Sequence, residues 1–220
     1  NGLPEGSSVF KRLKEGLKPE ELGLDHYPKP GEELAEPILD VSTKLEERDR
    51  YLTWAEAQKC AGMTNHEMGE IRERLLRIDD LITGICAPAG LKNEDGKIEL
   101  AMNPKREIIV VDVVGTLDEC RFTYGGEHVS KEVARQYYRK TGWYKDVESA
   151  KKTAFSKGVE DWKSLCTSQP PKLDAILKEI IGEMYASVAN HFLDRELFDA
   201  PPLADVMKKY GEYLAGRKAG

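Results

Sequence analysis

The sequence predicts an α+β fold in which helices cover an antiparallel sheet. Two runs rich in Val, Ile and Leu, Lys97–Met102 and Glu107–Val114, flank an Asn-Pro turn and indicate a hairpin. After residue 64, apolar residues recur at steps of three and four, which is typical of a long amphipathic helix. Strands and helices do not alternate along the chain, so a doubly wound parallel sheet is not expected.

Capping and breaking residues place the elements before this hairpin. A short helix is expected at Val9–Glu15, and a strand at Ile38–Thr43. Two capping boxes, Thr53–Glu56 and Thr64–Glu67, begin a short helix and the long one, which ends before Pro88. The apolar stripe of the long helix is expected to be core, with Met68, Ile71, Leu75, Ile78, Ile82 and Ile85.

The last part of the chain is expected to be helical. After a Gly-Gly turn in Thr123–Val129, Ser130 begins a helix to about Lys140, which Gly142-Trp143-Tyr144 breaks. Four further helical segments are expected near 147–154, 159–166, 173–195 and 201–214, the third with Ile176, Ile180, Ile181, Met184 and Val188 inward. We divide the chain into a domain of residues 1–145 and a helical extension, 146–220, packed on it.

Composition narrows the function classes. A net charge of −6 and a pI near 5.4 argue against a nucleic-acid surface. Since no run approaches the roughly 18 apolar residues that cross a bilayer, we expect no membrane partner. Four scattered cysteines without a CxxC pair argue against a zinc ribbon and favour a reducing, cytoplasmic location. Any metal is then expected to be a hard cation held by carboxylates.

Charged residues interrupt the apolar pattern of the predicted hairpin. Glu99 lies on one arm and Asp112 on the other, so the two carboxylates are expected to meet on one surface. Asp118 and Arg121 follow in a Gly-containing loop. This combination suits a divalent cation and a phosphate. The alternative is that each of these residues makes a surface salt bridge.

Two further segments have competing interpretations. Gly6-Ser7-Ser8 precedes a helix, where free backbone N–H groups can bind phosphate, although a simple N-cap by Ser7 or Ser8 is the commoner arrangement. Charged residues crowd the stretch 44–49, including Lys44, Glu46 and Asp49. Such a run is usually a solvated face, and a substrate-binding role is the other reading.

The order of these motifs resembles the SAICAR synthase (phosphoribosylaminoimidazole-succinocarboxamide synthase) family. Asp95–Ala101 resembles the family's D-x-K-x-E-F-G stretch, and Asp118–Phe122 its D-x-x-R-[FL] segment. Gly6-Ser7 resembles its phosphate loop, and Ser42–Glu46 its S-T-K-x-E motif. The resemblance covers about residues 1–145, including Ser130–Arg135 on the following helix. Departures at Leu100, Ala101, Leu117 and Thr123 affect the fine substrate geometry.

This resemblance implies a fold and a reaction. It implies a SAICAR-synthase-like, ATP-grasp-like domain in which ATP and Mg²⁺ serve as cofactors. The reaction joins L-aspartate to carboxyaminoimidazole ribonucleotide (CAIR) through an acyl phosphate, in purine biosynthesis. A homo-oligomer is expected, because most relatives are oligomers. Since this route needs no covalent enzyme intermediate, Cys120 is interpreted as a packed thiol.

The resemblance also implies roles for individual residues. Glu99 and Asp112 would bind Mg²⁺, and Lys97 would neutralise phosphoryl or carboxylate charge. The remaining roles concern the substrates: Ser7 and Arg121 for the 5′-phosphate, Asp118 for the ribose, and Lys44, Glu46 and Asp49 for the imidazole or aspartate side.

Two alternatives stay open at this stage. The first is a related ligase that acts on another carboxylate and amine, which the departures at Leu117 and Thr123 would permit. The second is a non-catalytic nucleotide-binding fragment or subunit. The reason for this alternative is that the family's N-terminal ATP-binding domain has no counterpart in the chain. The chain begins at Asn1 and is expected to be a fragment or a processed product.

Overall fold

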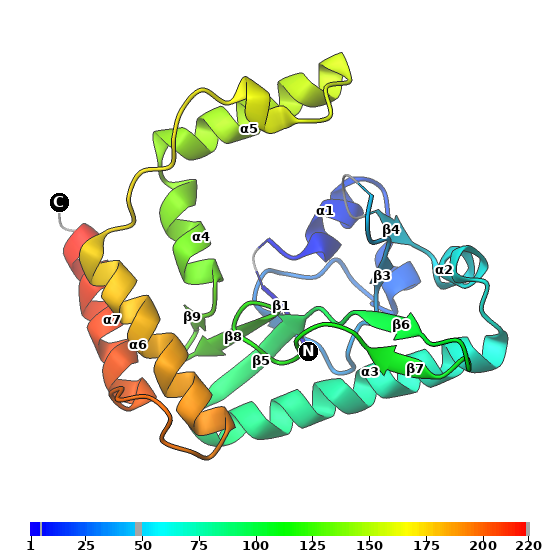
Figure 1. Ribbon diagram of the computed structural model, residues 1–220, viewed down its shortest axis with the longest axis horizontal. Coiled ribbons are helices and arrows are strands. Elements are labelled where there is room, and N and C mark those ends of the chain that lie inside the picture. The colour runs from blue at the N-terminus through cyan, green and yellow to red at the C-terminus, as the bar shows by residue number, and fades with distance from the viewer. Residues whose placement is uncertain (5, 47–49, 219–220) are drawn as a thin grey trace. The chain divides into compact units, whose positions relative to one another are not determined.

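The α+β class is confirmed in a computed structural model, which describes residues 1–4, 6–46 and 50–218 (Figure 1). The chain forms two compact units, Asn1–Thr123 and Tyr124–Gly220. Our division at residue 145 followed the extent of the family resemblance rather than compactness, and it stays a prediction. All residues predicted for the site belong to the first unit.

The first unit combines helices with several small sheets instead of the one sheet we predicted. Its helices are α1 (Ser8–Lys14), η1 (Pro19–Leu22), α2 (Trp54–Ala61), α3 (Asn65–Cys86) and η2 (Ala87–Ala89). Its strands are β1 (Gly2–Leu3), β2 (Glu32–Glu33), β3 (Val41–Ser42), β4 (Tyr51–Leu52), β5 (Leu91–Gly96), β6 (Leu100–Met102), β7 (Ile108–Val110) and β8 (Cys120–Tyr124). The pairs β1–β2, β3–β4 and β6–β7 are antiparallel, and β5 lies beside β8. Charged and turn-forming residues keep most of these strands to two or three residues.

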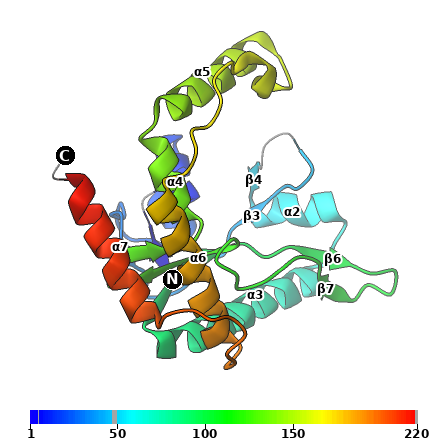
Figure 2. The same cartoon turned by 60° about the vertical axis from the view of Figure 1, so that its left-hand side comes forward.

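The predicted central hairpin is the pair β6–β7, with Leu100 opposite Val110 and Met102 opposite Ile108. Its strands are shorter than predicted. The Asn-Pro turn is confirmed, because the side-chain oxygen of Asn103 accepts hydrogen bonds from the N–H groups of Lys105 and Glu107, both at 2.9 Å. Figures 1 and 2 both draw this hairpin alongside α3.

An ion pair fastens the tip of this hairpin to the start of α3. Arg106, which has a φ of 63°, donates from Nε to Oε1 of Glu67 at 2.6 Å and from Nη2 to Oε2 at 2.7 Å. Glu67 also accepts from the N–H of Thr64 at 2.7 Å, completing the predicted capping box. The Arg106 guanidinium is the main reason that the pKa of Glu67 falls from 4.5 to about 2.

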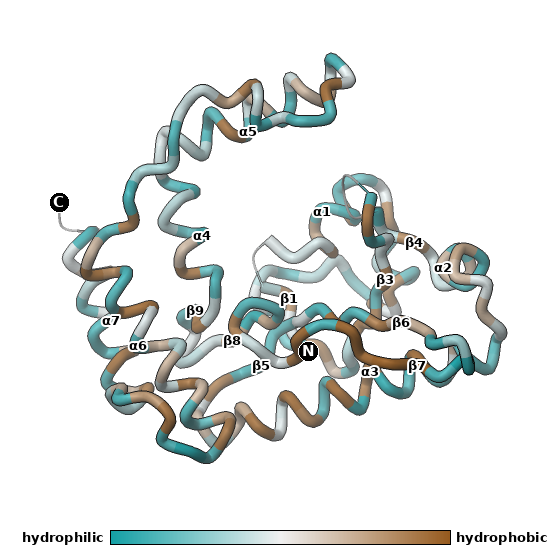
Figure 3. The backbone as a smooth tube through the Cα atoms, in the orientation of Figure 1, coloured by the Kyte–Doolittle hydropathy of each residue, from teal (hydrophilic) through white to brown (hydrophobic). Residues whose placement is uncertain are grey.

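The long helix α3 is confirmed, but its stripe is only partly core. Met68 is buried in a cluster with Leu52 and Ala57, and Ile82 is buried as well. Ile85 was predicted to be core and is 48% exposed. The amphipathic pattern, visible along α3 in Figure 3, thus extends beyond the surface that packs against it.

Strands β5 and β8 are among several that were not predicted, β5 because its residues are mostly polar. Strand β5 reads LKNEDG, and β8 begins directly after the Asp118 loop. Gly96, the last residue of β5, permits the close approach of the two strands. A Cβ atom on Gly96 would lie 2.7 Å from Sγ of Cys120.

The second unit is mostly helical, as predicted, and the strand near its start was not predicted. It contains β9 (Glu127–Val129), α4 (Glu132–Arg139), α5 (Gly142–Lys157), η3 (Trp162–Leu165), α6 (Ala175–Phe192) and α7 (Leu203–Lys218). The helix that was predicted to end near Lys140 ends at Arg139, as α4. Gly142 was predicted to lie in the break but begins α5, because the hydroxyl of Thr141 caps this helix by accepting from the N–H of Tyr144 at 3.3 Å.

Helices α6 and α7 pack against each other through buried apolar residues. On α6, Ile180, Met184 and Val188 are buried as predicted, whereas Ile176 is 56% exposed. Ile176 is the second residue of the helix and precedes the first buried residue, Leu177. Among the described residues, no helix has both the length and the hydropathy that a membrane span requires.

The Glu67–Arg106 pair predicts an acid-dependent loss of stability. The carboxylate has a lower pKa in the folded chain (about 2) than its ordinary value of 4.5, so its contribution is full above pH 4.5. The contribution is lost as the pH falls toward 2. In urea unfolding, Glu67→Gln should therefore be less stable than the wild type at pH 7, with the difference shrinking below pH 4.5. The control is Glu73→Gln, an exposed position on the same helix; an equal deficit for both variants would contradict the prediction.

Gly96→Ala should destabilise the first unit. The added Cβ would press on Sγ of Cys120, which is buried and cannot retreat into solvent. Overpacking of this kind costs about 1–3 kcal/mol. The matched control is Gly84→Ala in α3, where an added Cβ meets nothing within 4 Å. Thermal unfolding should show a lower midpoint only for Gly96→Ala, and unchanged stability there would refute the close approach.

Candidate functional site

A carboxylate held between two ammonium groups is at the centre of the candidate site. The side chain of Glu99 is 10% exposed, and its Oε1 lies 2.8 Å from Nζ of Lys97. Its Oε2 contacts Nζ of Lys44. The two lysines are 52% and 57% exposed, so the ammonium groups reach solvent while the carboxylate does not. Three residues predicted for the site are thus brought together.

Backbone hydrogen bonds fix where these three residues meet. The carbonyl of Glu99, just before β6, accepts from the N–H of Val111 at 3.1 Å and extends the hairpin by one step. The N–H of Lys97 donates to the carbonyl of Glu119 at 3.0 Å, which joins the segment directly after β5 to the Asp118 loop. Lys44 comes from a different segment, two residues after the end of β3.

Asp112 makes no ion pair with the described residues. It follows Val111, beyond the end of β7, and its side chain is exposed. Its Oδ1 accepts from the N–H of Val113 at 2.8 Å. The hairpin register sets Val111, not Asp112, opposite Glu99.

Arg121 makes a two-pronged ion pair with Asp95. Nε of Arg121 donates to Oδ1 of Asp95 at 2.7 Å, and Nη2 donates to Oδ2 at 2.5 Å. The side chains are 18% and 31% exposed. Sequence reasoning included Asp95 in a motif but gave it no role. Its position two residues before Lys97 was the available signal.

Cys120 is a packed thiol, as interpreted from the sequence. It is 2% exposed, and burial raises its pKa to about 12. A thiol with so high a pKa is protonated near neutral pH and is a poor nucleophile.

The other predicted residues are more dispersed. Ser7 caps α1, with its Oγ accepting from the N–H of Val9 at 3.3 Å. Glu46 pairs with Arg50 at 3.0 Å, and hydrogen bonding to Arg50 lowers the pKa of Glu46. Asp118 is exposed in the loop before β8. Asp49 lies outside the described residues.

The donor set suits a magnesium ion that arrives with phosphate. Among the described residues, no group of three or more His, Cys, Asp or Glu side chains is arranged to hold a metal ion. In phosphate-transfer sites, however, Mg²⁺ uses one or two carboxylates together with substrate phosphates and water. Asp112 is exposed and meets that smaller requirement directly. Both oxygens of Glu99 already contact ammonium groups, so Glu99 could bind the ion only in exchange for one of these contacts.

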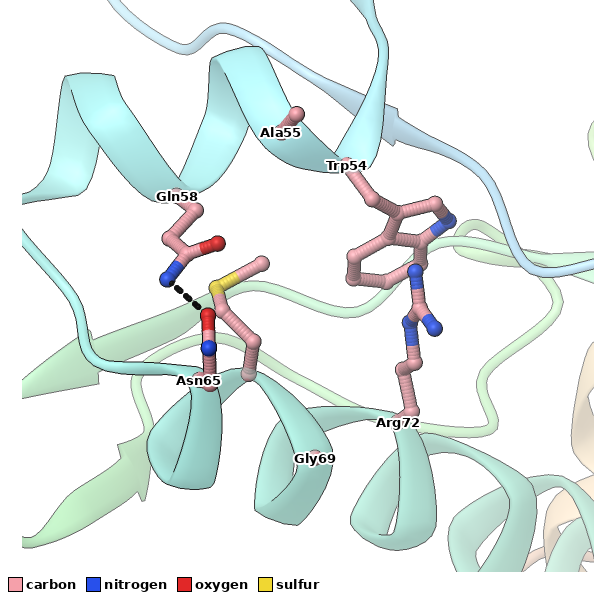
Figure 4. Close-up of a pocket in the computed structure, with 7 residues that line it drawn as sticks. Trp54, Ala55, Gln58, Asn65, Gly69 and Arg72 are labelled. Carbon is pink, nitrogen blue, oxygen red and sulfur yellow. Dashed lines mark hydrogen bonds between the residues drawn. The ribbon is translucent and has the colours of Figure 1, made fainter.

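A pocket of about 430 Å³ lies elsewhere in the first unit, between α2 and α3 (Figure 4). The guanidinium of Arg72 lies 4.3 Å from the ring centroid of Trp54 at one end. Gln58 donates to Asn65 at 2.7 Å at the other end. None of the residues predicted for the site lines this pocket.

Comparisons with solved structures support the fold. A SAICAR synthase of Saccharomyces cerevisiae complexed with SAICAR superposes with a TM-score of 0.60 at 20% identity, covering 89% of this chain and 58% of that one. A SAICAR synthetase in complex with ADP superposes with a TM-score of 0.50 at 21% identity, covering 77% and 62%.

Comparisons of sequence identify the family. A provisionally named phosphoribosylaminoimidazole-succinocarboxamide synthase of Archaeoglobus fulgidus is 42% identical over 215 residues, which are 97% of this chain. The chain spans 62% of the length of that relative. The family model described as SAICAR synthetase matches residues 8–156. The chain therefore belongs to the SAICAR synthetase family.

Proposed function

We propose that the protein to which this chain belongs joins L-aspartate to CAIR, with consumption of ATP, to give SAICAR. Membership of the family and the name of the Archaeoglobus relative support this proposal. The reaction activates a carboxylate as an acyl phosphate, which the amine of aspartate then attacks. We also infer a cytoplasmic, homo-oligomeric enzyme of purine biosynthesis, because that is the setting of the reaction in the family.

The observation that carries the proposal is the contact of Glu99 with both Lys44 and Lys97. One carboxylate and two ammonium groups leave a net charge of +1, which attracts an anion. Because the lysines are about half exposed, they can contact a substrate without losing the buried carboxylate that orients them. Lys97 would neutralise a transferring phosphoryl group or the CAIR carboxylate, and Lys44 would contact the imidazole or aspartate side.

The Arg121–Asp95 pair supports a phosphate-binding role nearby. Asp95 occupies Nε and Nη2 of Arg121, which leaves the N–H groups of Nη1 for the 5′-phosphate of CAIR. The hydroxyl of Ser7 accepts from the helix backbone and keeps its own hydrogen for the same phosphate. Asp118, exposed in its loop, is suited to the ribose hydroxyls.

ATP and Mg²⁺ are the proposed cofactors. When bound, Mg²⁺ would offset the charge of the polyphosphate, with Glu99 and Asp112 as its protein ligands. The ADP in a solved relative supports nucleotide binding in the whole protein. The residues of this chain would then bind, orient and neutralise anionic groups.

Removing the charge of Glu99 or Asp112 should slow the full-length enzyme. Glu99→Gln and Asp112→Asn should each lower kcat by more than about tenfold, since a charged hydrogen-bond or metal contact is worth roughly 1.5–3 kcal/mol. The measurement is SAICAR formation that depends on both ATP and aspartate. Glu73→Gln is the control, and rates within about tenfold of wild type for both site variants would overturn the metal assignment.

Arg121→Lys should weaken CAIR binding more than it slows the chemistry. Lysine keeps the charge but cannot pair with Asp95 and a phosphate through a planar fork. The KM for CAIR should rise about tenfold or more, with a smaller change in the KM for aspartate. Steady-state kinetics with each substrate varied in turn provide the measurement. An equal rise in both KM values would contradict phosphate binding by Arg121.

A further inference from the structure

An ion pair between Arg12 and Asp40 connects two segments that carry predicted site residues. Arg12 belongs to α1, which Ser7 caps, and Asp40 directly precedes β3, which leads to Lys44. The side chains of Arg12 and Asp40 are 18% and 23% exposed. The pair is therefore largely shielded from solvent, where an ion pair is screened less than on an open surface.

Each member of this pair also contacts the β3–β4 hairpin directly. The guanidinium of Arg12 lies 4.8 Å from the ring centroid of Tyr51, on β4. Oδ1 of Asp40 accepts from the N–H of Val41, the first residue of β3, at 3.2 Å. One guanidinium thus connects α1 to both strands of the hairpin.

The hairpin itself is too short to fix its own orientation. Its strands have two residues each, with Val41 opposite Leu52 and Ser42 opposite Tyr51. Isolated two-stranded hairpins are at best marginally stable, so side-chain contacts must decide where this one lies. The Arg12–Asp40 pair supplies such a contact before β3, and the Lys44–Glu99 pair supplies one after it.

The backbone beside Lys44 shows that this segment is constrained. Leu45 has a φ of 71° and is 95% exposed, so neither backbone preference nor packing favours a leucine there. A non-glycine residue in this region is strained and persists where its surroundings fix it. Its neighbours are both held, Lys44 by Glu99 and Glu46 by Arg50.

We propose that Arg12 and Asp40 are positioning residues that fix the ammonium group of Lys44 against Glu99 for the ligase reaction. This inference rests on the proposed function, in which Lys44 contacts an anionic substrate. Loss of the pair frees one side of the hairpin and displaces Lys44, although neither Arg12 nor Asp40 touches the substrate. A displacement of about 1 Å lowers rates by up to about 100-fold.

The test is a double-mutant cycle on kcat/KM in the full-length protein. Asp40→Asn removes the charge and keeps an oxygen for the N–H of Val41, and Lys44→Ala removes the group that is positioned. Asp40→Asn should lower kcat/KM by about tenfold or more in the wild-type background. In the Lys44→Ala background the same substitution should change kcat/KM by less than about twofold, so the two effects should be strongly non-additive.

A purely structural pair gives a different result. Asp40→Asn would then cause the same fold-loss in both backgrounds, which would overturn the proposal. Asp40→Glu, which keeps the carboxylate, should recover part of the activity. If Asp40→Asn does not fold, Arg12→Lys enters the same cycle, because lysine keeps the charge but lacks the guanidinium fork. If Lys44→Ala has no measurable turnover, the cycle is read on the Kd for CAIR.

The matched control is Glu67→Gln, which breaks another arginine–carboxylate pair in the same unit. Its pair with Arg106 holds the far end of the β6–β7 hairpin, so its effect should add to that of Lys44→Ala. Coupling as strong as that of Asp40→Asn would count against a specific role for Arg12 and Asp40. An inactive wild-type enzyme would refute the proposed function itself, whereas an active one with an additive cycle would refute this inference alone.

Discussion

The burial of the Glu99 carboxylate is the constraint on which the arrangement of the candidate site depends. A buried carboxylate costs several kcal/mol unless positive partners compensate it. Lys97 and Lys44 provide this compensation from segments far apart in the sequence. The need to pair one charge therefore brings together the residues between β5 and β6 and the residues that follow β3. The same contacts leave one positive charge in excess, which favours an anionic ligand.

Arginine–carboxylate pairs connect segments whose strands are too short to do so. Arg106 joins the β6–β7 turn to α3, and Arg12 joins α1 to the β3–β4 hairpin. Arg121 fixes Asp95 beside the loop that carries Asp118. Arg106 and Arg121 each bind their carboxylate through two hydrogen bonds, so these pairs set direction as well as distance. This geometry suits a site that must hold several anionic groups in fixed positions.

Local patterns predicted those parts of the fold whose stabilising contacts are local. The capping boxes at Thr53 and Thr64 and the Asn103 turn involve residues three or four positions apart, and all three are present. Strand β5 was missed because its polar residues are buried by tertiary partners, as in the hydrogen bond from Thr123 to Glu94 at 2.9 Å. The exposure of Ile85 was missed for the complementary reason, since periodicity identifies an apolar face but not its partner.

By itself, the sequence determined the class of fold, the starts of α2 and α3 and the motif order that marks the SAICAR synthetase family. It also indicated Lys44, Lys97 and Glu99 as site residues, through their places in those motifs. Only the tertiary structure decided that these three charges meet, and that Asp95 and Asp40 pair with Arg121 and Arg12. The physical reason is that motifs record residue types along one dimension, whereas charge pairing depends on strand register and on contacts between distant segments.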